Sequence, residues 1–239
     1  MARKSDYGQF CPIAMTAEIL AVRWTPLVIR ELLCGSHRFS DPQRGLPLMS
    51  PSLLSTRLRE LEFAGIVERQ PAENGKGHDY YLTEGGQELR PIIEAFGLWS
   101  QKWLDHEYTE EHLDPSLLMW DIRRTVDCRF MPEDKLVSVE FELHGFKSKQ
   151  KRWWLMFDHG EADLCNKDPG HEVDLFVKAH VRDLTEVWMG KRRLDDATRD
   201  GSLVLEGSLP QVRNFPKWFS LNMYAATAPQ TNPEVVVSA

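Results

Sequence analysis

Arginines and small hydroxyl side chains concentrate in one stretch of this sequence, between Ser36 and Arg59. The stretch holds four arginines and a single acid, Asp41. Guanidinium and hydroxyl groups suit the phosphates and base edges of double-stranded DNA, because they donate hydrogen bonds to its oxygen and nitrogen acceptors. A local basic surface is enough for phosphate contacts even in a chain of net charge −7.

Residues 52–64 predict the helix that presents most of these groups. Ser50 followed by Pro51 is typical of a helix start, and Gly65 of a helix end. On a helical wheel one stripe is apolar and the opposite face is small, polar and basic. The inward residues are Leu54, Leu58 and Leu61, and the residues predicted to contact DNA in this region are Arg44, Ser50, Ser52, Ser55, Thr56, Arg57 and Arg59. Arg57 lies nearer the buried edge, so we expect it to serve the fold or a phosphate rather than a base.

A hairpin follows this helix directly. Its presence favours a DNA-contacting helix over an ordinary amphipathic helix with a solvated face. Residues 66–69 and 79–82 predict two paired strands, and Asn74-Gly75 between them is a strong turn signal. Lys76 and His78 place positive or polar groups at the tip, where we expect phosphate or minor-groove contacts. A polar-faced helix followed by a basic hairpin predicts a winged helix-turn-helix.

Further helices are expected on both sides of these elements. Residues 12–21, 27–33 and 39–46 predict three short helices, and Thr25 before Pro26 is a candidate cap for the second of them. Ser40 or Asp41 is available to cap the third. Residues 83–103 predict the last helix, which Pro91 must either kink or start anew.

Catalytic and metal-binding motifs are missing from the sequence. It contains no P-loop, no HExxH and no GxSxG or GxGxxG pattern. The loose cluster of His159, Asp163, Cys165 and His171 matches no standard metal-ligand spacing. The four cysteines lie far apart, which is typical of a protein in a reducing cytosol. We therefore expect no catalytic residue, no metal, no cofactor and no enzyme.

Residues 10–104 resemble the HxlR family of winged-helix regulators. The resemblance is carried by CPIAMTAEILAVRWTPLVIRELLCGSHRF, LSTRLRELEFAGIVER and YYLTEGGQEL, followed by a last helix that contains tryptophan. It implies a homodimer built on the first and last helices, which binds a palindromic operator through two recognition helices and two wings. Ala21-Val22 departs from the family, which usually has glycine before Arg23-Trp24, so the form of this turn stays open.

Cys11 begins the Cys-Pro motif of that resemblance, and in some family members this cysteine senses oxidants or electrophiles. It precedes a predicted helix, whose N-terminus would lower the pKa of the thiol. The other interpretation is a small residue that packs the dimer interface. Both interpretations are kept.

The second half of the chain predicts a sheet with helices. Five strands are expected, at residues 136–143, 152–158, 161–166, 172–177 and 202–206, with helices at 116–127, 183–189, 194–199 and 210–219. The first strand alternates, so it should have one wet face with Ser138, Glu140 and Glu142. The second strand is apolar on both sides, which indicates burial on both faces or a neighbouring cavity.

Residues 180–220 resemble the closing part of sterol-carrier-protein-like domains, carried by LTEVWMGKRRLDDATRDGSLVLEGSLPQVRNFPKWF. The resemblance implies a mostly antiparallel five-stranded sheet and an apolar tunnel. Candidate lining residues are Trp120, Phe141, Trp153, Trp154, Phe157 and Trp188. Aromatic residues are also common in ordinary cores, so a structural domain without a ligand remains the alternative.

Together these features predict an α+β protein with three parts. A DNA-binding and dimerisation domain spans 1–108, a sterol-carrier-like domain 109–224 and a flexible tail 225–239. The expected function is that of a cytoplasmic, homodimeric, ligand-responsive repressor. Its partners are double-stranded DNA, a second copy and an apolar small molecule, without a membrane. The alternative is a lipid carrier or a hydrolase-like activity in the second domain.

Overall fold

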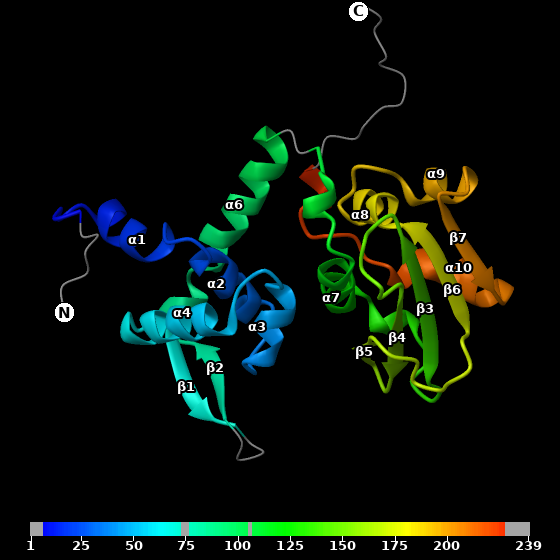
Figure 1. Ribbon diagram of the computed structural model, residues 1–239, viewed down its shortest axis with the longest axis horizontal. Helices are drawn as coiled ribbons and strands as arrows, with labels where there is room; N and C mark the ends of the chain where they lie inside the picture. The colour runs from blue at the N-terminus through cyan, green and yellow to red at the C-terminus, as the bar shows by residue number, and fades with distance from the viewer. Residues whose placement is uncertain (1–6, 73–76, 105–106, 228–239) are drawn as a thin grey trace, which may run out of the picture. The chain divides into compact units, whose positions relative to one another are not determined.

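The computed structural model describes residues 7–72, 77–104 and 107–227. Lys76 of the predicted wing and residues 228–239 of the predicted tail lie outside the described residues. The chain divides into two compact units, Met1–Gly97 and Leu98–Ala239 (Figure 1). The expected domain boundary, after residue 108, falls within the second unit.

The first unit has the predicted order of helices around a small sheet. The helices are α1 (Pro12–Leu20), α2 (Thr25–Leu33), α3 (Ser40–Gly45), α4 (Pro51–Phe63), α5 (Glu84–Gln87) and α6 (Arg90–Trp103), of which α6 continues past Gly97. The strands β1 (Val67–Pro71) and β2 (His78–Leu82) pair antiparallel. Pro91 is the second residue of α6, so the proline starts a new helix, one of the two outcomes expected for it.

Local capping explains where α4 and α5 begin. The Ser50 side chain accepts a hydrogen bond from the Leu53 amide at 3.3 Å, and Pro51 follows as the first helical residue. The hydroxyl of Thr83 accepts one from the Gly86 amide at 3.2 Å. These groups satisfy amides that the first turn of a helix leaves unpaired.

The expected caps of α2 and α3 are wrong. Thr25 is already the first residue of α2, and the capping position belongs to Trp24, whose φ of +78° is left-handed. Without glycine in this turn, a bulky residue takes the strained conformation. In α3 the capping position belongs to Phe39, and neither Ser40 nor Asp41 supplies a side-chain cap.

The core of the first unit contains the predicted leucine stripe. Leu54, Leu58 and Leu61 of α4 are buried, together with Val28 and Ile29 of α2. The same region contains the fully buried acid Glu31, whose carboxylate accepts from Arg30 at 2.6 Å and from Ser36 at 3.4 Å.

The second unit is a five-stranded sheet with helices. The strands are β3 (Val137–His144), β4 (Arg152–Asp158), β5 (Glu161–Cys165), β6 (Leu175–His180) and β7 (Leu203–Gly207), in the order β5-β4-β3-β6-β7. The helices are α7 (Pro115–Thr125), α8 (Val181–Trp188), α9 (Leu194–Arg199) and α10 (Leu209–Trp218), and the 3₁₀ turns are Glu110–His112, Cys128–Phe130 and Ala225–Thr227. Only the β3–β6 pair is parallel, so the sheet is mostly antiparallel, as expected, but mixed.

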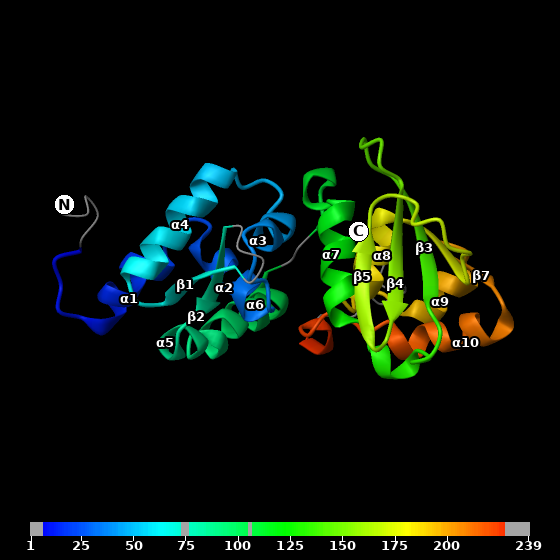
Figure 2. The same cartoon turned by 90° about the horizontal axis from the view of Figure 1, so that it is seen from below.

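All four of these helices contribute to one core on a single face of the sheet. Alternate residues of β3 and β4, such as Phe141, Trp153 and Phe157, join this core with Met119 of α7 and Trp218 of α10. Figure 2 shows α8 and α9 behind β3 and β4. The other face carries Glu140 and Trp154, which are neighbours in the strand register.

The expected wet face of β3 is wrong for Ser138 and Glu140, whereas the Glu142 side chain is 41% exposed. Ser138 is 1% exposed and Glu140 is 7% exposed. Because β3 is the central strand, its side chains are flanked by those of β4 and β6, and Arg152 of β4 approaches the Glu140 carboxylate at 3.3 Å. A buried charge of this kind needs a paired partner.

Two smaller expectations also change. The fourth strand begins at Leu175 instead of residue 172, because the preceding Asp174 uses its carboxylate to accept from the Ser138 amide and from Lys135. The tail expected from residue 225 begins with a 3₁₀ turn, and a Cβ added to Gly190 would lie 2.7 Å from Ala225. Among the described residues, no single helix is long and apolar enough to span a bilayer; α1 and α2 pass that test only as a pair bent by 81°.

Candidate nucleic-acid interface

Helix α4 presents a polar and basic surface opposite its buried leucines. Ser52 and Arg59 are exposed, and Ser55 and Thr56 are half-buried beside them. The Arg59 side chain lies along the helix, with 3.4 Å from its Nε to the Ser55 carbonyl oxygen and 3.4 Å from its Nη2 to the Thr56 hydroxyl. These contacts are long and solvent-exposed, so the guanidinium is available to a base or phosphate.

Arg57 and Arg44 sit in different environments although both were predicted to contact DNA. Arg57 forms an ion pair with Glu60 and donates to the Arg23 carbonyl at 3.3 Å. It therefore ties α4 to the turn before α2, which is the fold-supporting role considered for it. Arg44 is exposed in the last turn of α3, on the segment that leads to α4.

The wing is anchored to the chain before α3. The Tyr80 amide donates to the His37 carbonyl at 2.8 Å, and the backbone of Arg38 forms an isolated antiparallel β-bridge with that of Asp79. His78 is exposed at the start of β2, where it pairs with Pro71. This bridge holds the wing in a defined position beside the segment that leads into α3.

The structure adds two basic candidates that the sequence interpretation left out. Arg38 is exposed at the base of the wing, and Arg69 is exposed on β1. Arg38 was counted only as part of the local positive charge, and Arg69 only as part of a strand. The signal available in the sequence was a basic residue within a strand that borders the hairpin.

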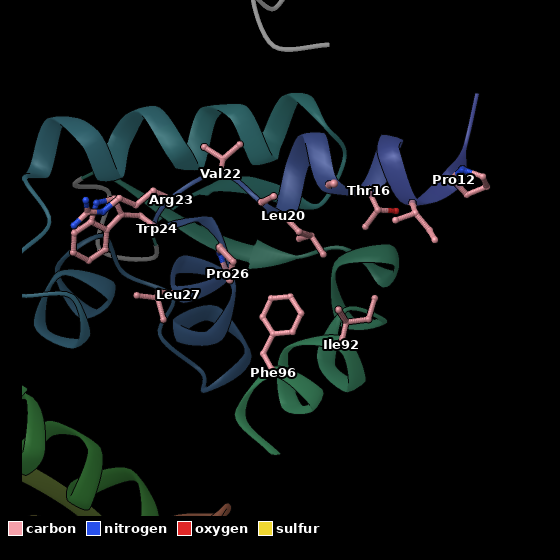
Figure 3. A pocket seen from close by; sticks show the side chains of 13 residues that line it. Pro12, Thr16, Leu20, Val22, Arg23, Trp24, Pro26, Leu27, Ile92 and Phe96 are labelled. Carbon is pink, nitrogen blue, oxygen red and sulfur yellow. The ribbon is translucent and has the colours of Figure 1, made fainter. Parts of the chain in front are cut away.

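An apolar groove runs between α1, α2 and α6 in the first unit. Its volume is about 820 Å³, and it is lined by side chains such as Ile13, Leu20, Leu27, Ile92 and Phe96 (Figure 3). Ile13 is 79% exposed and Phe96 is 53% exposed. A continuous exposed apolar face of this kind marks an interaction surface.

Cys11 occupies the N-cap position of α1, directly before two residues that line the groove. Its backbone is extended, its side chain makes no capping hydrogen bond, and it is half-buried. Both interpretations of Cys11 therefore stay open, because the thiol is accessible and also borders the apolar face. Elsewhere in the chain, burial raises the pKa of Cys128 and of Cys165, with nearby acids adding to the effect.

The six residues predicted to line a pocket in the second unit separate into groups. Phe141, Trp153, Phe157 and Trp188 belong to the single core between sheet and helices, and Trp154 lies on the opposite face of the sheet. Trp120 lies beneath the guanidinium groups of two arginines, Arg123 at 5.0 Å and Arg124 at 5.1 Å.

Trp218 is a further member of the core that the sequence interpretation did not select. It is fully buried, it packs edge-on against Phe157 with 5.1 Å between ring centroids, and its indole Nε1 is without a hydrogen-bond partner within the described residues. Its position in the run that resembles sterol carriers was the available signal.

The sequence predicts that the loose cluster of His159, Asp163, Cys165 and His171 binds no metal. Within residues 7–72, 77–104 and 107–227 no group of three or more His, Cys, Asp or Glu side chains is arranged to hold a metal ion.

Comparisons with known proteins place both halves of the chain. Residues 19–108 match the HxlR-like helix-turn-helix family, and a relative from Bacillus subtilis, the HTH-type transcriptional regulator YvaP, is 36% identical over 107 residues. The aligned part is 44% of this chain and 99% of YvaP. This chain belongs to the HxlR-like helix-turn-helix family.

Other similar proteins match the same region of this HxlR-like chain. The HTH-type transcriptional regulator sll1512 from Synechocystis is 36% identical over 106 residues, which are 44% of this chain and 78% of that protein. A solved structure, the reduced form of the transcriptional regulator YodB from B. subtilis, is 33% identical, with a TM-score of 0.36 over 41% of this chain and 97% of that one.

A second family model matches within the second unit of the HxlR-like chain. Residues 135–220 match the SCP-2 sterol transfer family. The family resemblance expected for both halves is therefore confirmed, with the sterol-transfer match extending over all five strands of the sheet.

Proposed function

We propose that this protein is a homodimeric repressor that binds palindromic operator DNA in the cytoplasm and releases it in response to an apolar small molecule. The observation that carries DNA binding is the division of α4, with Leu54 and Leu58 buried and Arg59 exposed on the opposite side. A helix of this form beside an anchored wing suits the major groove. The membership of the HxlR-like family supports the same proposal.

The apolar groove supports the homodimer. Ile13 of α1 and Ile92 and Phe96 of α6 expose apolar surface along two helices, and α6 continues with exposed Trp99 and Trp103. In a two-fold dimer the same face of a second copy covers this surface. Two recognition helices would then read half-sites about one DNA turn apart, or a multiple of it.

The test of DNA binding begins with operator DNA selected from a random pool by the full chain. Arg59→Ala should raise Kd by about 5- to 150-fold at fixed salt, corresponding to about 1–3 kcal/mol for an arginine that contacts a base. Arg213→Ala removes an exposed arginine of the second unit and serves as the control. Equal affinity of Arg59→Ala and wild type would contradict the assignment of α4 as the helix that contacts the operator.

Light scattering tests the dimer. Ile13→Glu places a charge on the apolar face and should yield monomers at micromolar concentration, because an unpaired charge is costly in an apolar interface. Leu48→Glu is the control, since Leu48 is 80% exposed but lies outside the groove. A wild-type monomer that still binds DNA would contradict the dimer.

The sterol-transfer domain supports the proposed effector site. Phe141, Trp153, Phe157 and Trp188 share its core, and Trp218 adds a buried indole N–H without an acceptor among the described residues. Because an unpaired buried donor is destabilising, a ligand with an apolar body and an oxygen acceptor suits this site. Tryptophan fluorescence titrated with fatty acids and sterols, then DNA binding with any hit present, tests the idea. No fluorescence change with any class would remove it.

Two further roles rest on single features. Cys11 either senses electrophiles or packs the dimer interface. If quinone treatment abolishes DNA binding by wild type but not by Cys11→Ser, Cys11 is a sensor.

A lipid carrier is the second candidate function, favoured by the match to the SCP-2 family. It would be preferred if ligand bound tightly and left Kd for DNA unchanged, since a ligand shifts an equilibrium only through its differential affinity for the two states.

A further inference from the structure

The hairpin between β3 and β4 carries a concentration of positive charge in the otherwise acidic second half of the chain. Lys147, Lys149, Lys151 and Arg152 fall within six residues that contain no acid. Lys147 and Lys149 are exposed, and neither forms an ion pair within the described part of the chain. The acids of β3 do not compensate them, because Glu140 and Glu142 face Arg152 at 3.3 and 3.8 Å.

The hairpin is held in one conformation by contacts of its own. Lys151 donates from Nζ to the Phe146 carbonyl at 2.8 Å and lies over the Phe146 ring, 4.0 Å from its centroid. Phe146 in turn packs against Trp153, with 6.1 Å between centroids. Gln150 donates to the Asn166 carbonyl at 2.9 Å, which ties the hairpin to the end of β5. Two free ammonium groups are therefore displayed on a fixed support.

We propose that this hairpin is a second DNA-contacting element, which binds phosphates that flank the operator through Lys147 and Lys149. The inference rests on the proposed DNA binding of the first unit. Ammonium groups on flexible stems bind phosphate as point charges and carry no sequence information. Once the first unit holds an operator, the flanking duplex is present at high effective concentration for the second unit of the same chain.

A membrane surface fits the hairpin less well than DNA. Stable attachment to anionic lipid combines basic residues with an apolar side chain that enters the bilayer. Phe146 is the single large apolar residue of the hairpin, and it is directed to the interior by its contact with Trp153. The tip thus offers charge alone, which matches a polyanion.

The experiment measures Kd against salt for the full chain on two DNA molecules, the selected operator alone and the operator with 20 bp added on each side. The proposed homodimer carries two hairpins, so Lys147→Ala/Lys149→Ala removes four lysines from the complex and, on the longer DNA, should reduce the slope of log Kd against log salt by about 3.6. The advantage of wild type over the variant should then shrink by about 150-fold between 50 and 200 mM salt. On the bare operator the two proteins should bind equally.

Controls separate charge from fold and from the first unit. Arg213→Ala/Lys217→Ala removes two exposed basic residues of α10 and should keep the wild-type slope, as should Lys147→Arg/Lys149→Arg. Unchanged slope for the alanine pair on long DNA, with operator binding intact, overturns the hairpin proposal and leaves the proposed function standing. If wild type binds phosphatidylserine vesicles and Lys147→Ala/Lys149→Ala does not, while the two proteins have the same salt slope on DNA, the hairpin is a membrane-binding element instead. Absence of operator binding by wild type would overturn both proposals.

Discussion

The two units differ in what they do with their large apolar side chains. The second unit buries Phe157, Phe215 and Trp218 almost completely in one core. The first unit leaves Ile13 and Phe96 exposed beside an open groove. One unit covers its large apolar side chains within the chain, whereas the other has an apolar face that a second copy can cover. Aromatic residues therefore indicate stability in one unit and association in the other.

The largest expected effect tests this difference directly. Phe157→Ala should lower the free energy of unfolding of the second unit by about 3–5 kcal/mol, because it removes a buried ring and leaves a cavity. Phe96→Ala is the matched change on the exposed face, and in a monomeric background it should alter stability by less than about 0.5 kcal/mol. Urea unfolding of both variants, made in Ile13→Glu, gives the two values. Equal losses would mean that Phe96 belongs to a core and that the contrast is wrong.

A smaller effect is expected beside the buried acid Glu31 of the first unit. A Cβ added to Gly45 would lie 2.0 Å from Oε2 of Glu31, a carboxylate that is fully buried. Gly45→Ala should therefore cost about 1–3 kcal/mol, as overpacking of a filled interior does. Gly85→Ala is the control, because nothing lies within 4 Å of an added Cβ there.

The Gly45 substitution also bears on the proposed DNA-binding surface. Arg30 donates to the Gly45 carbonyl at 3.2 Å, so the ion pair of half-buried Arg30 with buried Glu31 joins α2 to the end of α3. Displacement of Glu31 should move α3 relative to α2. If thermal unfolding shows Gly45→Ala and Gly85→Ala to be equally stable, the Glu31 carboxylate moves aside without cost and does not fix α3 relative to α2.

Elements with strong local signals were predictable from the sequence. Ser50-Pro51, the leucine stripe and Gly65 define α4 within one residue of its observed bounds, since capping and periodicity are local properties. Pro91 indicated either a kink or a new helix start, and α6 begins one residue before it. The polar and basic face of α4 followed from the same periodicity, and Arg57 was already placed toward the buried edge.

Features that depend on distant partners were not predictable in this way. The burial of Glu140 follows from its place on a central strand beside Arg152, which alternation within β3 cannot reveal. Trp24 takes the left-handed cap of α2 because the surrounding turn requires it, against the preference of a large residue. The six lining candidates shared only their aromatic type, so the separation of Trp154 from Trp153 by the sheet appeared only with the strand register.

The smallest expected effect concerns acid, which should act on the second unit through Asp200. The backbone amide of Ser202 donates to its carboxylate at 3.0 Å, and this bond, with the Ser202 hydroxyl and Arg192, holds the pKa of Asp200 below its ordinary value of 3.8. A carboxylate with a lowered folded-state pKa stabilises the fold fully above 3.8, and the contribution disappears as pH falls through the folded-state value. The urea midpoint of the second unit should thus fall between pH 4 and pH 3, and fall less in Asp200→Asn. Arg192→Ala should keep most of this pH dependence, because the Ser202 amide remains. Should Arg192→Ala abolish it as fully as Asp200→Asn does, the ion pair and not the amide controls the pKa of Asp200.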